Sequence, residues 1–180
     1  MVPNQPQPSI METALHQNKT FDTIDYSDQK LSDNEFINCE FINCNLAMID
    51  LTGTSLKTVR FKDCKLLGIH FSKCTDFLFN VNFQECVLDY SSFANKKMPK
   101  TKFNSCSLRE VSFVGTNLTS SVFDNSNLDG AIFNNTQLAG ADFSKATNFK
   151  IDPEFNPMKK AKFSTQGIIG LLDKYDIKIM

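Results

Sequence analysis

Along most of this chain of 180 residues, a large apolar residue returns at every fifth position, and mostly polar residues fill the gaps. The five-residue series runs through residues 31–71 and again through residues 88–143. A period of five fits neither the turn of an α-helix nor the alternation of a long strand. It predicts short extended segments joined by tight corners. Within this series a phenylalanine returns every twenty residues, with one two-residue slip, at Phe21, Phe41, Phe61, Phe83, Phe103, Phe123, Phe143 and Phe163.

A twenty-residue period predicts a solenoid in which four five-residue segments make one coil. A small residue stands two positions before most of the central Leu and Phe residues, as Cys106 does before Leu108 and Ala131 before Phe133. Small and large side chains then alternate in the interior, and polar residues face water. Each coil of a solenoid buries its apolar side only by stacking on its neighbours, so we expect one continuous domain.

The repeating unit is a small residue, then Asp, Asn or Ser, then Leu or Phe, then two loosely specified residues. The segment 126–133 shows it well, and in this respect the chain resembles the pentapeptide repeat family over roughly residues 19–149, with a late echo at Phe163. The resemblance implies an all-β solenoid, a right-handed, quadrilateral parallel β-helix with four repeats per coil. It also implies that adjacent coils lie about 4.8 Å apart, the strand spacing of a sheet.

The repeat pattern divides the chain into three parts. Residues 1–18 are expected to form a disordered or partly ordered leader, residues 19–149 the β-helix, and residues 150–180 a C-terminal cap. In the cap, Ser164 is placed to begin a short helix over residues 165–175, and the alternation over residues 175–179 is typical of an edge strand. The leader lacks the apolar core of a secretory signal, and no apolar run has the length of a membrane span. These features predict a cytoplasmic protein without membrane association.

The cap has too little apolar surface to be stable alone, and its edge strand needs a partner. The family resemblance implies a homodimer that closes this end through a two-fold contact. The alternative is that the helix folds over its own last coil and the protein stays monomeric. The candidate dimer interface consists of Phe163, Ile168, Leu171, Leu172, Ile177 and Ile179.

One lysine interrupts the interior pattern. Lys96 stands where a small buried residue belongs, and an unpaired buried lysine is costly. We therefore expect the corner to distort and to let this side chain reach solvent. Together with Lys97, Lys100 and Lys102 it would form either an ordinary solvated corner or a docking patch for an anionic partner.

The chain offers little chemistry for a catalyst. Its six cysteines fall on small inward positions without a C-x-x-C pair, so we expect free thiols and no metal. His16 falls in the expected leader, and His70 should point outward. Phosphate loops and catalytic motifs are missing from the sequence, so we expect neither a cofactor nor enzymatic activity.

Two functions remain open. The first is a rigid protein-interaction or structural module with an unidentified protein partner. The second comes from the resemblance, because some quinolone-resistance members of the family bind the type II topoisomerases DNA gyrase and topoisomerase IV by imitating duplex DNA. Mimicry needs a rod rich in carboxylates, whereas residues 34–148 carry eleven acidic and eleven basic side chains. With a formal net charge of −1, direct binding to nucleic acid is not expected.

Overall fold

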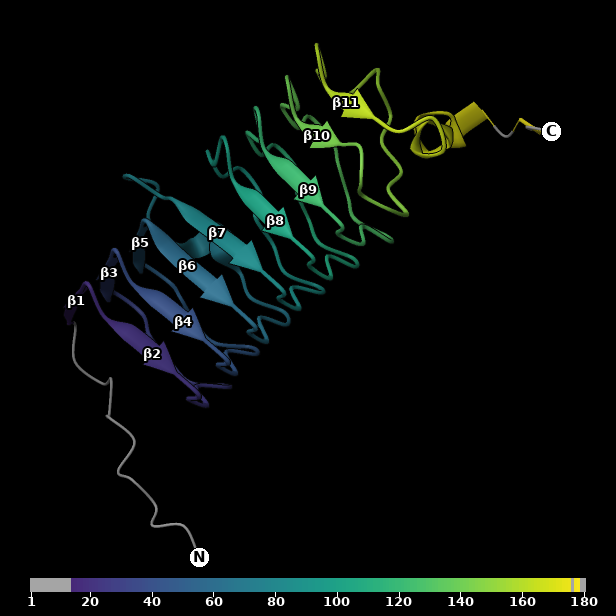
Figure 1. Cartoon of the computed structure of the whole chain (residues 1–180). Coiled ribbons are helices and arrows are strands. Elements are labelled where there is room, and N and C mark those ends of the chain that lie inside the picture. The colour runs from purple at the N-terminus through teal and green to yellow at the C-terminus, as the bar shows by residue number, and fades with distance from the viewer. Residues whose placement is uncertain (1–13, 176, 179–180) are drawn as a thin grey trace, which may run out of the picture.

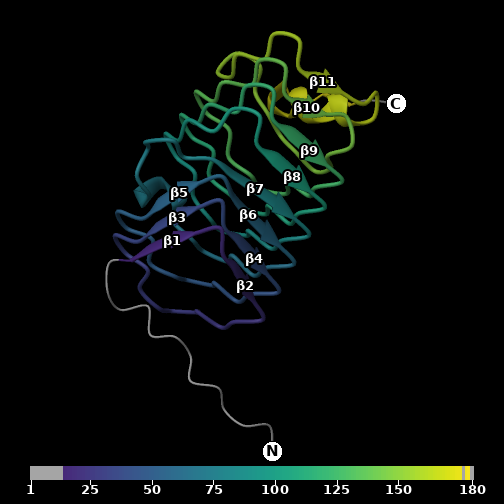
Figure 2. The same ribbon diagram turned by 60° about the vertical axis from the view of Figure 1, so that its left-hand side comes forward.

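The chain winds into a four-sided parallel β-helix (Figures 1 and 2), seen in a computed structural model that describes residues 14–175 and 177–178. Within the described residues one side carries an eight-stranded sheet, here called the long sheet, and a neighbouring side carries a three-stranded sheet, the short sheet. The short sheet consists of β1 (Leu15–Gln17), β3 (Glu35–Ile37) and β5 (Ser55–Lys57). The long sheet consists of β2 (Thr20–Asp22), β4 (Glu40–Ile42), β6 (Val59–Lys62), β7 (Val81–Gln84), β8 (Lys102–Asn104), β9 (Val122–Asp124), β10 (Asp142–Phe143) and β11 (Lys162–Phe163). The predicted fold class is confirmed.

The Phe column forms the centre of the core. Phe103 is fully buried between Phe83 and Phe123, with ring centroids 5.2 and 5.0 Å away and the rings nearly parallel. A second column crosses it edge to face, as Phe113 does at 5.8 Å from Phe103. The twenty-residue period therefore stacks a Phe of one coil on a Phe of the next. The stacked rings stabilise the core beyond the contribution of the apolar area that they bury.

The small inward side chains bind backbone carbonyls of the coil below. Thr116 Oγ1 donates a hydrogen bond to Phe93 O at 2.8 Å, and Thr136 Oγ1 donates one to Phe113 O at 2.8 Å. The Cys64 thiol makes the same contact with Phe41 O at 3.4 Å. Phe93 O and Phe113 O also accept backbone hydrogen bonds, so the side-chain donor uses the second lone pair of each carbonyl, a bond that alanine could not make.

Most corners use left-handed backbone at the residue two after the central position. Asn38, Asn43 and Met48 follow one another at five-residue intervals with φ of 52°, 52° and 58°. At another corner, a Cβ on Gly130 would come within 2.5 Å of Glu110 Oε1. Asn, Asp and Gly tolerate this conformation best, which explains why they recur in the repeat.

The N-terminal coil starts earlier than the sequence predicts. β1 begins at Leu15, within the expected leader, and His16 is buried where a central Phe or Leu would stand. The imidazole stacks on Phe36 at 4.7 Å and contacts Asn34 Oδ1 through Nε2 at 3.3 Å. The expectation that His16 lies outside the repeat is wrong, because a histidine ring fills the place of an apolar side chain.

The β-helix also continues beyond the expected boundary at residue 149. Asn156 occupies a small inward position, where its Nδ2 donates to Phe133 O at 3.2 Å and its Oδ1 accepts from Thr136 N at 3.0 Å. Phe163 then returns to the Phe column, 5.4 Å from Phe143. The chain therefore completes one further coil after Phe149 leaves the regular spacing.

The cap contains two 3-10 helices, η2 (Gly167–Leu171) and η3 (Asp173–Tyr175), in place of one continuous helix. Ser164 Oγ accepts a hydrogen bond from Gly167 N at 2.9 Å, but η2 begins at Gly167 and its N-cap residue is Gln166, so the helix starts later than predicted. No strand forms at residues 177–178, and the rest of the expected edge strand lies partly outside the described residues. Within the described part of the chain, no helix has the length and apolar character to cross a membrane.

Candidate interaction surfaces

The two-residue slip forms a bulge of residues 75–80 on the side of the short sheet. It follows the short 3-10 helix η1 (Phe71–Lys73), and it begins where Thr75 N donates to Thr54 O at 2.9 Å. Within the bulge, Phe77 and Leu78 project outward with 71% and 63% of their surface exposed, while Phe79 turns inward. The bulge interrupts the short sheet after β5 and leaves the long sheet continuous.

Lys96, on the following coil, is buried against this bulge, with only 2% of its surface exposed. Its Nζ donates to Cys74 O and to Asp76 Oδ1, the latter at 2.7 Å, and lies 5.0 Å from the centre of the Phe79 ring. The prediction that Lys96 reaches solvent is wrong, because the bulge one coil below supplies a carbonyl and a carboxylate. Lys96 therefore anchors the bulge and does not belong to an exposed patch.

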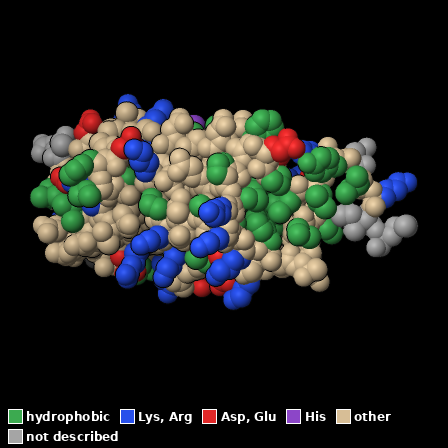
Figure 3. All heavy atoms as spheres, turned by 90° about the horizontal axis from the view of Figure 1, so that it is seen from above, with side chains coloured by type: hydrophobic (Ala, Val, Ile, Leu, Met, Phe, Trp, Pro, Cys, Tyr) green, Lys and Arg blue, Asp and Glu red, His purple; other side chains and the backbone are tan. Residues whose placement is uncertain are grey.

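The other three lysines of the predicted patch are exposed. Lys100 and Lys102 line a groove of about 340 Å³ across the long sheet, which they share with Arg60 and Lys62 of β6, whereas Lys97 is not part of its lining. We call this groove the basic groove. Figure 3 shows Lys and Arg side chains gathered along one edge of the middle of the shaft. The rest of the lining is Glu40, Phe61, Asn82, Phe83, Gln84 and Asn104.

The outward side chains of the long sheet alternate in character. In strand order, the residues at one rung are Thr20, Glu40, Arg60, Asn82, Lys102, Val122, Asp142 and Lys162. The centre of this ladder is basic, and acidic side chains lie on either side of it. The long sheet is therefore a flat face of mixed charge.

The candidate dimer residues divide into two groups in the cap. Phe163, Leu171 and Leu172 are partly buried, and Phe163 and Leu171 pack against the core. Ile168 and Ile177 are exposed, at 49% and 54% of their surfaces, and Ile179 lies outside the described residues. Three further exposed residues near this end, which the sequence patterns did not single out, are Phe155, Ile169 and Tyr175. Hydrophobic side chains gather at the C-terminal end in Figure 3.

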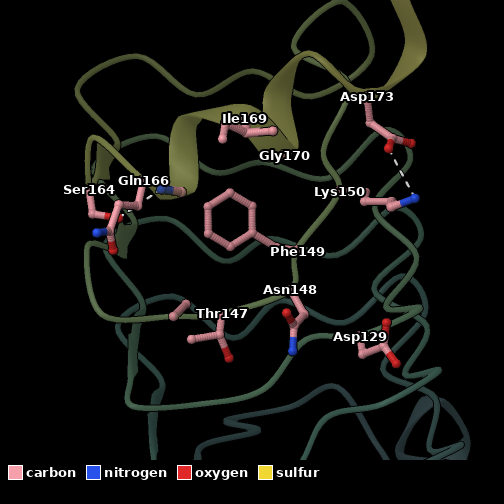
Figure 4. Close-up of a pocket in the computed structure, with 12 residues that line it drawn as sticks. Asp129, Thr147, Asn148, Phe149, Lys150, Ser164, Gln166, Ile169, Gly170 and Asp173 are labelled. Atoms are coloured by element: carbon pink, nitrogen blue, oxygen red, sulfur yellow. Dashed lines mark hydrogen bonds and ion pairs between the residues drawn. The ribbon is translucent and has the colours of Figure 1, made fainter. Parts of the chain in front are cut away.

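A cavity of about 450 Å³ separates the cap from the last coils (Figure 4). Phe149 points into it and packs against the helix η2, where a Cβ on Gly170 would come within 2.1 Å of Phe149 O. Lys150 Nζ and Asp173 Oδ1 form an ion pair 3.0 Å long at its rim. Ser164 Oγ accepts a hydrogen bond from Gly167 N. The residues that line the cavity therefore hold the cap against the last coil, and they do not form an arrangement typical of a catalytic site.

The thiols are poorly placed for reaction. All six cysteines are free and buried. Burial raises the pKa of the Cys74 and Cys106 thiols to about 12, so both remain protonated at neutral pH. In the described part of the chain, no group of three His, Cys, Asp or Glu side chains is arranged to hold a metal ion.

A search of curated protein sequences finds no match. Among solved structures, full-length QnrB1, a plasmid-mediated fluoroquinolone resistance protein, matches at 17% identity and a TM-score of 0.46 over 91% of this chain and 90% of that one. HetL, a pentapeptide repeat protein involved in heterocyst differentiation regulation in Nostoc sp. strain PCC 7120, matches at 12% identity and a TM-score of 0.31 over 82% and 86%. The family model of the pentapeptide repeat region matches residues 16–93 and 90–163. With its five-residue repeat and four-sided coil, the chain belongs to the pentapeptide repeat family.

Proposed function

We propose that this protein is a non-enzymatic, rigid interaction module that binds a protein partner through its long sheet. The observation that carries the proposal is the unbroken eight-stranded ladder, whose outward side chains carry both signs of charge. Members of the pentapeptide repeat family are generally structural or interaction modules, which agrees with this role. The six buried free thiols favour a reducing compartment such as the cytoplasm.

Rigidity is the property that suits such a module. Each coil is tied to the next by parallel backbone hydrogen bonds and by stacked Phe rings. A surface that is already ordered loses little conformational entropy when a partner binds. The flat sheet would thus recognise its partner through the spacing of its side chains and the sign of their charges.

Imitation of DNA towards a type II topoisomerase is the alternative that the family resemblance implied. Such a mimic must present carboxylates to a basic surface. The middle of the long sheet instead carries Arg60, Lys62 and Lys102, which would be repelled by a basic surface. This charge distribution favours the interaction module over the mimic.

We also propose that the protein forms a homodimer through its cap. Exposed Ile168, Ile169 and Ile177 leave apolar surface at the end of the shaft. A closed two-fold contact there would cover the last coil and prevent end-to-end growth of the sheets.

Partner capture from native extract tests the proposed face. A variant with Arg60→Glu and Lys102→Glu reverses the charge at the centre of the long sheet, and a corner variant with Lys159→Glu and Lys160→Glu makes the same charge change at an exposed corner of the last coil. We expect a partner retained by the wild type and the corner variant to be lost from the long-sheet variant. Equal retention by all three would contradict the proposed face, and inhibition of gyrase supercoiling by the wild type would favour the mimic.

A further inference from the structure

We infer that the basic groove binds an extended acidic polypeptide segment with carboxylates on alternate residues. The inference rests on the proposed interaction function and adds the chemistry of the partner. Arg60 and Lys62 reach the groove from β6, and Lys100 and Lys102 reach it from the corner and strand two coils further on. Four cations thus converge on one depression in a chain whose formal net charge is −1.

The positive charge of the groove is largely uncompensated. Among the residues that the structure describes, Arg60, Lys100 and Lys102 form no ion pair, and Lys62 has only a long contact of 3.9 Å with Asp63 Oδ2. The lysine at the other end of the same ladder differs, since Lys162 pairs with Asp142 at 3.2 Å. An anionic partner could therefore bind these cations without first breaking a close ion pair within this protein.

The spacing of the cations suits an extended peptide. The side chains of residues 60 and 62 point the same way from one strand and lie about 7 Å apart. Residue 102, at the same rung two coils further on, lies about 10 Å from residue 60. Alternate side chains of an extended peptide are also about 7 Å apart. A single phosphate or carboxylate would reach only part of this array.

Amide side chains between the cations can bind the peptide backbone. Asn82 and Gln84 lie on β7, between the strands that carry the cations, and Asn104 lies on β8. Asn82 Oδ1 accepts a hydrogen bond from Lys102 N at 2.9 Å, which fixes the carboxamide and leaves its Nδ2 as a donor. Donors of this kind match the carbonyl groups of an extended segment.

The boundaries of the groove favour a short acidic peptide over a nucleic acid. Glu40 forms part of the lining, and Asp124 and Asp142 follow further along the same sheet, so a long polyanion would run onto carboxylates. The two aromatic residues of the lining, Phe61 and Phe83, are buried and present no ring on which a base could stack.

Fluorescence anisotropy with defined probes tests the inference. The probe is a fluorescein-labelled octapeptide of alternating Glu and Ser, compared with a Gln and Ser octapeptide and with an eight-residue oligothymidylate. We expect the acidic peptide to bind best, and its binding to weaken as salt rises. Arg60→Glu with Lys102→Glu should weaken binding at least about tenfold, whereas Glu40→Gln should tighten it.

A matched control separates the groove from net charge. Lys159→Glu with Lys160→Glu makes the same charge change on the last coil. This variant should bind the acidic peptide with an affinity within about twofold of the wild type, because charges beyond a Debye length are screened. Arg60→Gln with Lys102→Gln provides a milder groove variant, and circular dichroism checks that each variant is folded.

The inference is overturned if the wild type does not bind the acidic peptide, if groove and control variants weaken binding equally, or if the oligothymidylate binds more tightly. Partner capture is a separate readout. A wild type that does not bind the acidic peptide, while its partner capture still depends on Arg60 and Lys102, would reject the peptide inference alone. A wild type that binds the peptide, while its partner capture does not depend on Arg60 and Lys102, would reject the proposed face.

Discussion

At the scale of single residues, the interior alternates between aromatic rings and small hydrogen-bond donors. The donors explain why Thr, Ser and Cys occupy positions where size alone would accept alanine. Thr116 is fully buried and donates to Phe93 O, and Ser126 makes the corresponding contact with Phe103 O at 3.0 Å. The identity of the small residue therefore contributes to the stability of the stack as well as to its packing.

Thr116→Val tests this role, because it keeps the shape of the side chain and removes the donor. We expect it to lower the free energy of unfolding by about 0.5–1.5 kcal/mol, the net contribution of one hydrogen bond, because Phe93 O keeps its backbone hydrogen bond from Lys96 N at 3.0 Å. Thr119→Val, at the partly exposed corner that follows Thr116 on the same coil, is the matched control. It should change stability by less than about 0.5 kcal/mol. Urea denaturation of both variants gives the comparison, and equal losses would argue against the donor role.

The burial of His16 predicts a pH dependence of stability. Burial lowers the pKa of His16, against a smaller opposing effect of Asn34, and Lys19 lowers it further. The folded state thus binds the proton less readily than the unfolded state, so stability should fall as pH drops through the usual histidine pKa of about 6.5. His16→Phe should flatten this fall in unfolding experiments between pH 7.5 and 5.5. An unchanged pH profile in His16→Phe would assign the effect to another group.

At the scale of elements, the irregularities form together rather than singly. The bulge of residues 75–80 needs Lys96 of the following coil, and Lys96 needs the carbonyl of Cys74 and the carboxylate of Asp76. In the cap, η2 can approach the last coil because Gly167 and Gly170 have no side chain to meet Phe149. Each pair consists of residues far apart in the chain that the coil brings into contact.

Lys96→Met tests whether this lysine orders the bulge. Loss of the ammonium leaves Cys74 O and Asp76 without that donor, so hydrogen exchange of residues 75–80 should become faster and stability should fall by about 1–3 kcal/mol. Lys97→Met is the neighbouring control, since Lys97 is exposed, and it should leave both quantities nearly unchanged. Equal exchange rates in the two variants would show that the bulge is ordered without Lys96.

The sequence predicts the repeating parts of this fold well because each five-residue segment carries its own inward residue. It does not predict where Lys96 points, because the bound carboxylate lies on another coil. The basic groove combines Arg60 with Lys102, which only the register of coils on either side of the slip brings together. The sequence does not place His16 in the core, because a histidine stands there in place of an apolar residue, and it does not indicate that Gly167 packs against Phe149.

At the scale of the whole molecule, the shaft presents one long ordered face and ends in an apolar cap. The long sheet runs without interruption from β2 to β11, and exposed isoleucines gather beyond it. A dimer through the caps would align two such faces in one particle. Binding by both faces to one partner would then gain from the high effective concentration of the second site.

Light scattering tests the dimer. The intact chain should show twice its 20.3 kDa mass at micromolar concentration, and Ile168→Glu with Ile169→Glu should reduce it to one chain by placing charges in an apolar contact. Met48→Glu with Val87→Glu changes two exposed apolar residues of the shaft and should leave the dimer intact. A monomeric wild type would refute the dimer, and a chain stopped at Asp173 that still dimerises would place the interface elsewhere.

Site-specific photo-crosslinking in the native cell tests most directly the central claim that the long sheet is the binding face. One photoreactive residue replaces Asn82 at the centre of the long sheet, and another replaces Ser112 on the opposite side of the shaft, one and a half coils further along the chain; both positions are partly exposed. We predict that a partner crosslinks through position 82 and not through position 112. Crosslinking of the same partner only through position 112, or equally through both, would contradict the claim.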